Sequence, residues 1–410
     1  MKIYSVGGSV RDELLGRPVA DRDYVVVGAT PEQMLSQGFR PVGRDFPVFL
    51  HPDTREEYAL ARTERKRGRG YHGFEFHAAP DVTLEEDLAR RDLTINAMAR
   101  GEDGALVDPY GGAADLAAGI LRHVSAAFAE DPLRVLRTAR FAARYGFSIA
   151  PETEALMRAI VASGELSTLG PERVWQELAR ALMERLPSRF FTVLRTCGAL
   201  EQLLPEVDVL FGVPQPIAHH AEFDTGVHLL RALDFSAAAG DPLAVRYAVL
   251  AHDLGKAATA RGDWPRHIGH EAVGGRLAQR LSARLRAPAE CGDLARLAAR
   301  YHATVHRAPE LKPATMLDLL LATDALRRPE RLEGLLRACA ADMMSRPGSS
   351  GDYAPRTWLR EALEVVRGVD AGRIAAAHPE ALDLPQKIRA ARIKALREWA
   401  RAQKKTDGSS

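Results

Sequence analysis

The pattern of apolar and polar positions divides the chain into two kinds of structure. Up to about residue 110, short β-rich runs stand between glycine and proline residues, which is typical of strands joined by turns. These runs are Lys2–Val6, Tyr24–Val27, Val48–His51 and Tyr58–Ala61. From about Asp115 onward, apolar residues recur at helical spacing. The pattern therefore predicts an α+β protein, in which an N-terminal α/β head is followed by an almost entirely helical body.

Breaks in this pattern divide the chain further. The proline-rich stretch Leu204–Pro216 separates a first helical block from a second block that holds most of the histidines. Another interruption, Arg346–Pro355, is rich in glycine, serine and proline, and the polar end Lys404–Ser410 is expected to be disordered. We predict domains that span residues 1–115, 116–205, 206–345 and 346–410.

Composition is that of a globular protein from a reducing compartment. Apolar residues make up 46% and charged residues 27% of the 410 residues. The cysteines Cys197, Cys291 and Cys339 form no C-x-x-C pair, which argues against a disulfide framework or a thiolate zinc site. The chain shows no leader pattern and no run of the roughly 18 apolar residues that a membrane span needs. We therefore expect a cytoplasmic protein without membrane contact.

Positive charge is concentrated in two places, although the net charge is only +2. The stretch Arg62–Arg69 carries basic residues among glycines, and Arg134, Arg137, Arg140 and Arg144 recur along one predicted helix. Each of these residues could be ordinary solvated surface charge. Their clustering also fits a site for a nucleotide or a nucleic acid.

A glycine turn followed by two carboxylates is the first indication of chemistry in the head. Gly7 and Gly8 follow the first predicted strand, where backbone N–H groups could face a phosphate that Arg11 would also contact. Asp21 and Asp23 start the next strand, and residues two apart on a strand point to the same face. Such a pair is either an exposed turn or a Mg²⁺ site, because Mg²⁺ prefers carboxylate oxygens together with substrate phosphates. The glycine turn upstream favours the metal.

The order of motifs in the head makes a family resemblance specific. The motifs are Gly7–Asp12 (GGSVRD), Asp21–Val27 (DRDYVVV), Arg62–Lys66 (RTERK), Arg90–Ala97 (RRDLTINA) and Glu130–Arg134 (EDPLR). In this order they resemble the bacterial CCA-adding enzymes of the polymerase-β superfamily (class II). The resemblance implies a polymerase-β-type nucleotidyltransferase head, a helical neck and body that selects the nucleotide and binds tRNA, and an HD domain. The implied reaction adds or repairs the 3′-terminal CCA of tRNA with CTP and ATP, without a nucleic-acid template.

The resemblance also implies roles for individual residues. Asp21 and Asp23 would hold Mg²⁺ for two-metal phosphoryl transfer, in which the tRNA 3′-hydroxyl attacks the α-phosphorus in line. A third carboxylate is usual in the superfamily, and Glu57 is the candidate, with Glu56 as the neighbouring alternative. The residues implied to bind the incoming nucleotide are Gly8, Arg11, Arg91, Arg137 and Arg140. Arg91 could also form an ion pair with Asp92 at a helix start.

Selection of the base can be argued from hydrogen bonding. Cytosine and adenine both present an amine beside a ring-nitrogen acceptor, whereas uracil and guanine carry a carbonyl where the amine would be. Asp131 and Arg134 lie three apart on a predicted helix and would accept from the amine and donate to the ring nitrogen, as the family's E-D-x-x-R motif is held to do. Because steps of three residues rotate about 60° short of a turn, Asp131 and Arg140 would face opposite sides of that helix. Arg137 and Arg140 are therefore expected to contact neighbouring parts of the nucleotide or to orient the helix.

A histidine and aspartate pattern in the second half resembles the HD-domain phosphohydrolases. It consists of His228, the adjacent His252 and Asp253 in the predicted helix Leu243–Lys256, and Asp324. Histidine and aspartate together suit a divalent metal that activates water. For an HD-bearing family member the resemblance implies hydrolysis of 2′,3′-cyclic phosphates, 2′-nucleotides and phosphate monoesters with Mg²⁺ or Ni²⁺. Four further histidines could line the same site or lie at the surface: His267, His270, His302 and His306.

Other classes of protein share some of these features. A bacterial poly(A) polymerase resembles the head but adds only A, and Asp45 and Pro47 interrupt the more basic pattern that such a polymerase has there. An HD phosphohydrolase or nucleotide sensor with a non-catalytic head would not need Asp21 and Asp23. A non-enzymatic RNA-binding module would bind tRNA without turnover. We further expect a monomer or a weak homodimer.

Overall fold

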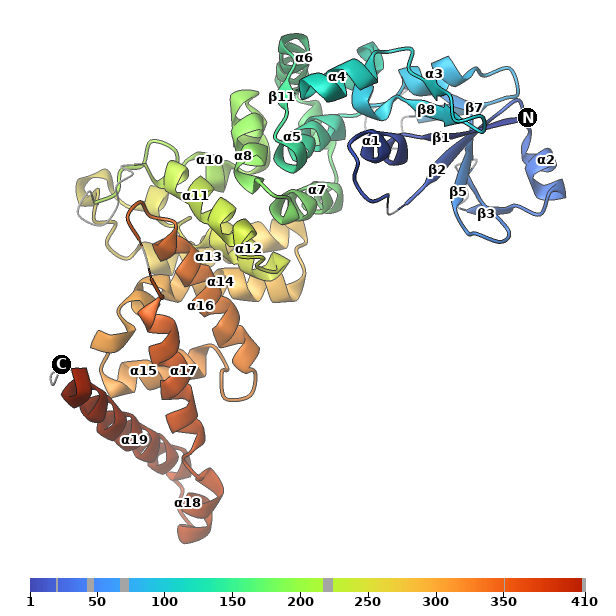
Figure 1. The fold of residues 1–410 in the computed structure, drawn as a ribbon. Helices are drawn as coiled ribbons and strands as arrows, with labels where there is room; N and C mark the ends of the chain where they lie inside the picture. The colour runs from blue at the N-terminus through green and yellow to red at the C-terminus, as the bar shows by residue number, and fades with distance from the viewer. Residues whose placement is uncertain (20, 43–47, 67–73, 217–223, 350, 408–410) are drawn as a thin grey trace. The chain divides into compact units, whose positions relative to one another are not determined.

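The computed structural model describes residues 1–19, 21–42, 48–66, 74–216, 224–349 and 351–407. The chain forms two compact units, Met1–Leu204 and Pro205–Ser410, which run from blue to green and from yellow-green to red in Figure 1. Asp45 and Pro47, which bear on the poly(A) polymerase alternative, lie outside the described residues, as does part of the basic stretch Arg62–Arg69. The finer division into domains ending at residues 115, 205 and 345 stays a prediction.

The head is built on a mixed seven-stranded sheet with the order β3-β4-β5-β2-β1-β8-β9. At its centre, β1 (Lys2–Val6) runs antiparallel to β2 (Asp23–Val27), and β2 runs parallel to β5 (Glu57–Leu60). The outer strands are β3 (Arg40–Val42), β4 (Val48–Leu50), β8 (Ala99–Gly101) and β9 (Leu106–Val107). Two further strands, β6 (Arg62–Lys66) and β7 (Phe74–Ala78), form a separate pair.

The apolar run of β2 fixes where the head places Asp23. Val25 belongs to one buried cluster with Leu88 of α3 (Leu84–Ala89), and Val26 belongs to another with Met34 of α2 (Pro31–Ser36). Successive strand residues point to opposite faces, so this run is buried on both sides of the sheet. A slip of the strand pairing by one residue would turn each valine towards the cluster on the other face. The pairing is therefore strongly specified, and Asp23 stands opposite Val6 on one side and Glu57 on the other.

Helices make up most of the rest of the first unit, together with a short parallel pair of strands, β10 (Ile120–Leu121) and β11 (Ser148–Ile149). The helix α5 (Leu133–Tyr145) packs against α7 (Pro171–Met183) and α8 (Pro187–Thr196) and ends at Gly146, whose φ of 76° is left-handed. The arginines of α5 do not form a free basic stripe, because Arg137, Arg140 and Arg144 all pair with carboxylates. Contact of these arginines with a nucleotide or a nucleic acid stays a prediction.

Among its described residues, the second unit contains helices and connecting turns but no strand, and histidines gather at its centre. Its core helices are α11 (Thr225–Ala238), α12 (Leu243–Ala251), α13 (His270–Leu285), α14 (Ala289–His306) and α16 (Pro329–Met344). The predicted helix Leu243–Lys256 ends earlier, at Ala251, and His252 and Asp253 begin the turn that follows. Within this turn a Cβ at Gly255 would collide with the carbonyl oxygen of His270, so only glycine permits the close packing.

The C-terminal part differs from its prediction. The segment α17 (Ala354–Arg367) is followed by α18 (Ala371–Ala377) and by α19 (Leu384–Asp407), which continues through most of the stretch expected to be disordered from Lys404. The many alanine, arginine and lysine residues of α19, all of which have high helix propensity, favour helix up to its polar end. Within the part of the chain that the structure describes, none of the helices is long and apolar enough to cross a membrane.

Candidate active sites in the two units

A cleft in the first unit collects most of the residues implied to bind the nucleotide. It has a volume of about 590 Å³ and lies between the central strands of the sheet and the start of α5. Predicted site residues that line it are Gly8, Arg11, Asp23, Glu57, Arg91, Asp131, Arg134 and Arg137. Asp21 and Arg140 are not in its lining: Asp21 is exposed just before β2, and Arg140 is buried in α5.

The sheet register brings two of the predicted metal carboxylates together. Asp23 and Glu57 are directly opposite on parallel strands, where paired residues lie on the same face. Desolvation in the cleft raises the pKa of Asp23, Arg91 lowers it in part, and the negative charge of Asp21 raises it further. Glu56 accepts a hydrogen bond of 2.8 Å from Thr54 Oγ1 in the turn before β5. The geometry favours Glu57 over Glu56 as the third carboxylate, which stays a prediction.

Two arginines are fixed at the glycine turn. The φ of Gly7 is 69°, and a side chain there would come within 2.8 Å of Nη1 of Arg91. Nη2 of Arg91 pairs with Asp87 at 3.3 Å, so the expected pair between Arg91 and Asp92 is replaced by one with Asp87. Arg11 is buried, and its Nε donates to Asp12 at 3.0 Å. Both guanidinium groups are therefore held in place before a ligand arrives.

A buried network connects α5 to the head and to α7. Nε of Arg137 donates to Oδ2 of Asp92 at 2.8 Å, and Oδ1 of Asp92 accepts from Nδ2 of Asn96 at 2.9 Å. Burial alone would raise the pKa of Asp92, but Arg137 and Asn96 together lower it well below the usual range. Nε of Arg140 donates to Glu177 of α7 at 2.6 Å. Arg140 therefore holds two helices together and does not face the cleft.

The two residues implied to read the base are close together but do not share a helix. Asp131 precedes α5 with extended backbone, and its Oδ1 accepts the N–H of Leu133 at 3.0 Å as a cap. Asp131 therefore lies before the helix, and the prediction that Asp131 and Arg140 face opposite sides of one helix is wrong. Its Oδ2 pairs with Nη2 of Arg173 at 2.8 Å, a residue of α7 that the sequence reasoning did not single out. Arg134 donates to the backbone carbonyl oxygens of Ala127 and Arg90 at 2.8 and 2.6 Å.

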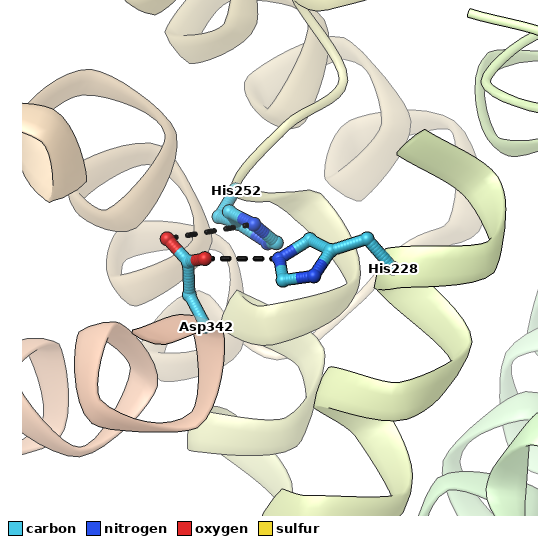
Figure 2. A group of neighbouring side chains, drawn as sticks. All are labelled: His228, His252 and Asp342. Atoms are coloured by element: carbon cyan, nitrogen blue, oxygen red, sulfur yellow. Dashed lines mark hydrogen bonds and ion pairs between the residues drawn. The ribbon is translucent and has the colours of Figure 1, made fainter. Parts of the chain in front are cut away.

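A second candidate site lies inside the second unit. His228, His252 and Asp342 come from three different parts of the fold. The two histidine side chains point at the carboxylate of Asp342, as Figure 2 shows. Nε2 of His228 lies 2.9 Å from Oδ1 of Asp342, and Nε2 of His252 lies 3.9 Å from Oδ2. Burial would lower the pKa of His252, but Asp253 and Asp342 raise it to about 9. All three side chains are buried, with ligand atoms within 4.8 Å of one another, so they could hold a metal ion.

The acidic position of this group was assigned to the wrong residue. Asp324 follows α15 (Pro313–Ala322) in a left-handed turn with φ of 54°, and its carboxylate lies 3.9 Å from Nε of Arg328. It takes part in neither of the candidate metal groups found among the described residues. Asp342 occupies the position instead. The signal that could have found Asp342 is its place in the apolar run Ala338–Met343, because an acid buried in an apolar helix needs a partner.

The further histidines all belong to the interior of this unit. Asp253, His270 and His302 form a second buried group that could hold a metal ion. Nε2 of His306 bonds Asp342 at 2.7 Å, and its Nδ1 lies 2.7 Å from the hydroxyl of Tyr353. Nε2 of His267 donates to the carbonyl oxygen of Pro214 at 2.7 Å. The alternative that these histidines lie at the surface is therefore wrong.

Comparison with known families agrees with this combination of sheet and cleft. The family model "Poly A polymerase head domain" matches residues 3–122, and "Probable RNA and SrmB- binding site of polymerase A" matches residues 146–211. The fold and the family match thus define a nucleotidyltransferase with a poly(A) polymerase-type head. Multifunctional CCA proteins of Nitrosomonas europaea and Dechloromonas aromatica are each 62% identical to this chain. The first match covers 95% of this chain and of the relative, and the second covers 97% of each. The chain belongs to the family of multifunctional CCA proteins.

Solved structures agree with the fold. A Bacillus stearothermophilus CCA-adding enzyme in complex with CTP is 22% identical, with a TM-score of 0.65, and the match covers 99% of this chain and 94% of that one. A Thermotoga maritima CCA-adding enzyme complexed with tRNA is 21% identical, with a TM-score of 0.61 and coverage of 96% and 87%. At this identity the likeness establishes the fold. The predictions of the α+β fold class, the family and the nucleotidyltransferase class are confirmed.

Proposed function

We propose that this protein adds or repairs the 3′-terminal CCA of tRNA, using CTP and ATP without a nucleic-acid template. The observation that carries this proposal is the 62% identity with multifunctional CCA proteins over nearly the whole chain. The cleft that gathers glycine, carboxylate and arginine side chains from separate motifs supports the same reaction. Nucleotidyl transfer needs little covalent help from the protein, because positioning and charge stabilisation supply most of the catalysis.

The carboxylates and the arginines of the cleft have complementary roles. Asp21 and Asp23, with Glu57 as the third carboxylate, would hold Mg²⁺, which when bound neutralises charge on the attacking and leaving oxygens. The raised pKa of Asp23 fits a group that a cation stabilises in its charged form. Arg11 and Arg91 are held by Asp12 and Asp87, so they can receive the triphosphate without large rearrangement.

Asp131 and Arg134 would read the base at the other side of the cleft. The carboxylate of Asp131 is held by Arg173 and by the cap bond to Leu133, and each of its oxygens keeps a further lone-pair direction for an amine hydrogen. The amine of cytosine or adenine can donate there, whereas O4 of uracil or O6 of guanine would be repelled. Arg134 is fixed by two backbone carbonyls, which sets the plane of its guanidinium group. Arg137, fixed by Asp92, would contact a neighbouring part of the nucleotide.

The histidine site would provide a second, hydrolytic activity. We propose that His228, His252 and Asp253 hold Mg²⁺ or Ni²⁺ together with Asp342, which replaces Asp324 in the predicted set. The fit is supported by Nε2 of His252, which is buried and has no hydrogen-bond partner although carboxylates surround it. A metal bound there would lower the pKa of a coordinated water. The expected substrates are 2′,3′-cyclic phosphates, 2′-nucleotides and phosphate monoesters.

An incorporation assay on tRNA that lacks its terminal CCA tests the transferase proposal. Each nucleoside triphosphate is offered alone, and CTP is then offered together with ATP. We expect two C residues from CTP alone, a complete CCA from CTP with ATP, and no significant use of UTP or GTP. Long A tracts made without CTP would contradict the proposal and favour a poly(A) polymerase. Binding of tRNA without any incorporation would favour a sensor or a binding module with a non-catalytic head.

A further inference from the structure

One asparagine lies where several arginines of the transferase cleft meet. Asn96 lines the cleft at the end of the short 3₁₀ helix η2 (Thr94–Asn96), and only 6% of it is exposed. We propose that Asn96 is a positioning residue for nucleotidyl transfer, whose amide group sets the guanidinium groups of Arg11 and Arg137. This inference deepens the transferase half of the proposed function and rests on it.

The partners of Asn96 determine which way its amide points. Nη1 of Arg11, in α1 (Gly8–Leu14), lies 2.5 Å from Oδ1 of Asn96, and Nδ2 of Asn96 lies 2.9 Å from Oδ1 of Asp92. A guanidinium group only donates hydrogen bonds, and an ionised carboxylate only accepts them. Burial would raise the pKa of Asp92, but Arg137 and Asn96 lower it well below the usual range, so Asp92 is ionised. The amide oxygen must therefore face Arg11 and the amide nitrogen Asp92.

Three arginines of the cleft are connected by this one residue. Arg11 donates to its side-chain oxygen, and Nη1 of Arg91 lies 3.4 Å from its main-chain oxygen. Arg137 is reached through Asp92, whose Oδ2 accepts from Nε of Arg137 at 2.8 Å. Asn96 therefore links the two arginines proposed to receive the triphosphate with the arginine that α5 contributes.

Arg11 needs a second fixed point in addition to Asp12. Its Nε and Nη2 lie 3.0 and 2.9 Å from Oδ1 of Asp12, which holds one edge of the planar group. The rings of Phe141 and Tyr145 lie 5.3 and 5.2 Å from its guanidinium carbon and restrict its face. Asn96 holds the remaining end, Nη1. Charge stabilisation depends on donors that are oriented before the reaction, so this last contact sets the direction in which Arg11 can donate.

Side chains of nearly the same shape do not meet both demands at position 96. Aspartate lacks the donor, and its charge would lie as close to Asp92 as the 2.9 Å of the present bond. Leucine lacks both polar groups. The chain uses aspartate and leucine throughout but has no other asparagine, so its composition does not supply this residue type by chance.

Loss of the amide should weaken nucleotide binding. We expect Asn96→Ala to raise KM for CTP and ATP in CCA addition, and the Kd of CTP, about tenfold or more, the worth of one hydrogen bond to a charged group. The control is Thr153→Val, which removes a buried hydroxyl outside the cleft that accepts from the backbone N–H of His123 at 3.0 Å. It should keep both constants within about twofold although it also loses a buried hydrogen bond. Unchanged constants in folded Asn96→Ala would overturn the proposal.

Asn96→Asp tests the direction of the amide through a pH profile. At pH 8.5 the new carboxylate should repel that of Asp92, and kcat/KM should fall about 100-fold. A neighbouring carboxylate favours a shared proton as pH falls, and the protonated group donates to Asp92 and accepts from Arg11 as the amide does. The guanidinium groups around the pair oppose this protonation without preventing it: Arg11, Arg91, Arg134 and Arg137.

The ratio of kcat/KM between Asn96→Asp and the unmodified protein should therefore rise about tenfold from pH 8.5 to pH 5.5. The same ratio for Asn96→Ala should stay constant, because alanine does not titrate. A constant ratio for Asn96→Asp would overturn the proposal, since a side chain that only fills space would not respond to pH. Folding is checked by circular dichroism, and Asn96→Ser replaces Asn96→Ala if the latter does not fold.

Combined substitutions separate positioning from direct contact with the nucleotide. In an Arg11→Gln background, Asn96→Ala should raise KM for CTP by less than about threefold further, because the group that it positions is already absent. A full further tenfold increase would mean that Asn96 contacts the nucleotide itself and would overturn the positioning role. If the unmodified protein bound CTP without adding CCA, the proposed function would be contradicted, and the Kd comparison would still decide this inference. CCA addition with an unchanged KM in Asn96→Ala would do the reverse.

Discussion

The head cleft and the histidine site both gather charged groups, but they differ in which kinds of groups compensate those charges. In the cleft, several guanidinium groups pair with carboxylates, as Arg137 does with Asp92 and Arg173 with Asp131, although Nε of Arg91 is buried without a hydrogen-bond partner. In the histidine site, Nε2 of His252 and Oδ1 of Asp253 are buried without hydrogen-bond partners. Burying polar atoms in this state is costly unless a ligand completes them.

The difference corresponds to the size of what each site would bind. A nucleotide and an RNA end need an open surface whose side chains are already oriented, and mutual ion pairs hold the arginines in place without the ligand. A metal ion is small and is surrounded on all sides by its ligand atoms. These atoms can lack hydrogen-bond partners until the ion binds. We therefore expect the cleft to be stable without ligand and the histidine site to depend on its cation.

The largest expected effect separates the two activities. Asp21→Ala and Asp23→Ala should each reduce CCA addition roughly 10³-fold or more, because they remove several kcal/mol of charge stabilisation from the transferase site. Hydrolysis of 2′,3′-cyclic phosphate should stay within twofold. Both activities are measured on the same preparation, with Asp53→Ala, an exposed acid of the head, as the control. Equal loss of both activities would contradict a two-site enzyme.

The reverse effect is expected in the second unit. His252→Ala and Asp253→Ala should reduce hydrolysis roughly 10²-fold or more by removing metal ligands, with CCA addition unchanged. The pair Asp342→Asn and Asp324→Asn sharpens this test, because only Asp342 faces the histidines. We expect the first to lose hydrolysis and the second to keep it. Loss of hydrolysis in Asp324→Asn alone would mean that Asp324, and not Asp342, is the acidic metal ligand.

A smaller effect concerns the stability of the cleft. Asp92→Ala leaves Arg137 without its buried partner and should lower the free energy of unfolding by about 3–5 kcal/mol. The exposed pair of Glu154 and Arg158 supplies the control, because Glu154→Ala should cost about 0.5 kcal/mol or less. Both values come from denaturant unfolding. Similar values for the two variants would mean that the buried network does not stabilise the head.

The pH dependence of the same pair has a defined sign. The pKa of Asp92 is lowered in the folded protein, so its contribution is present above the ordinary pKa of about 3.9 and is lost as pH falls through the folded value. The stability difference between the parent and Asp92→Asn should therefore be constant from pH 8 to pH 5 and shrink only at more acid pH. A difference that falls between pH 8 and pH 6 would contradict this assignment.

The smallest expected effect is on base selection. Arg173→Ala frees the carboxylate of Asp131, so the preference for CTP over UTP in kcat/KM should fall about tenfold, close to the worth of one hydrogen bond to a charged group. Overall addition of C should fall less. Arg180→Ala serves as the control, because Arg180 lies on the same helix but is exposed and 3.9 Å from Glu177. Unchanged preference would mean that Arg173 does not position the base-reading group.

Much of this protein was determined by the sequence itself, because the relevant signals are local. The apolar run of β2 specifies a strand buried on both sides, and with it the position of Asp23; the order of short motifs identifies the family. The adjacent His252 and Asp253 marked the second site. These inferences depend on residues only a few positions apart, where strand and helix periodicity act directly.

Only the tertiary structure decided which distant groups meet. Asp92 and Arg137 are 45 residues apart, and His228 and Asp342 are 114 apart, so no periodicity relates them. Asp324 and Asp342 are both acids near helix ends, and the packing of α16 against α11 and α12 brings only the second to the histidines. The sequence restricts which residues can carry the chemistry. Close packing of whole elements selects among them, because a side chain reaches only a few ångströms from its backbone.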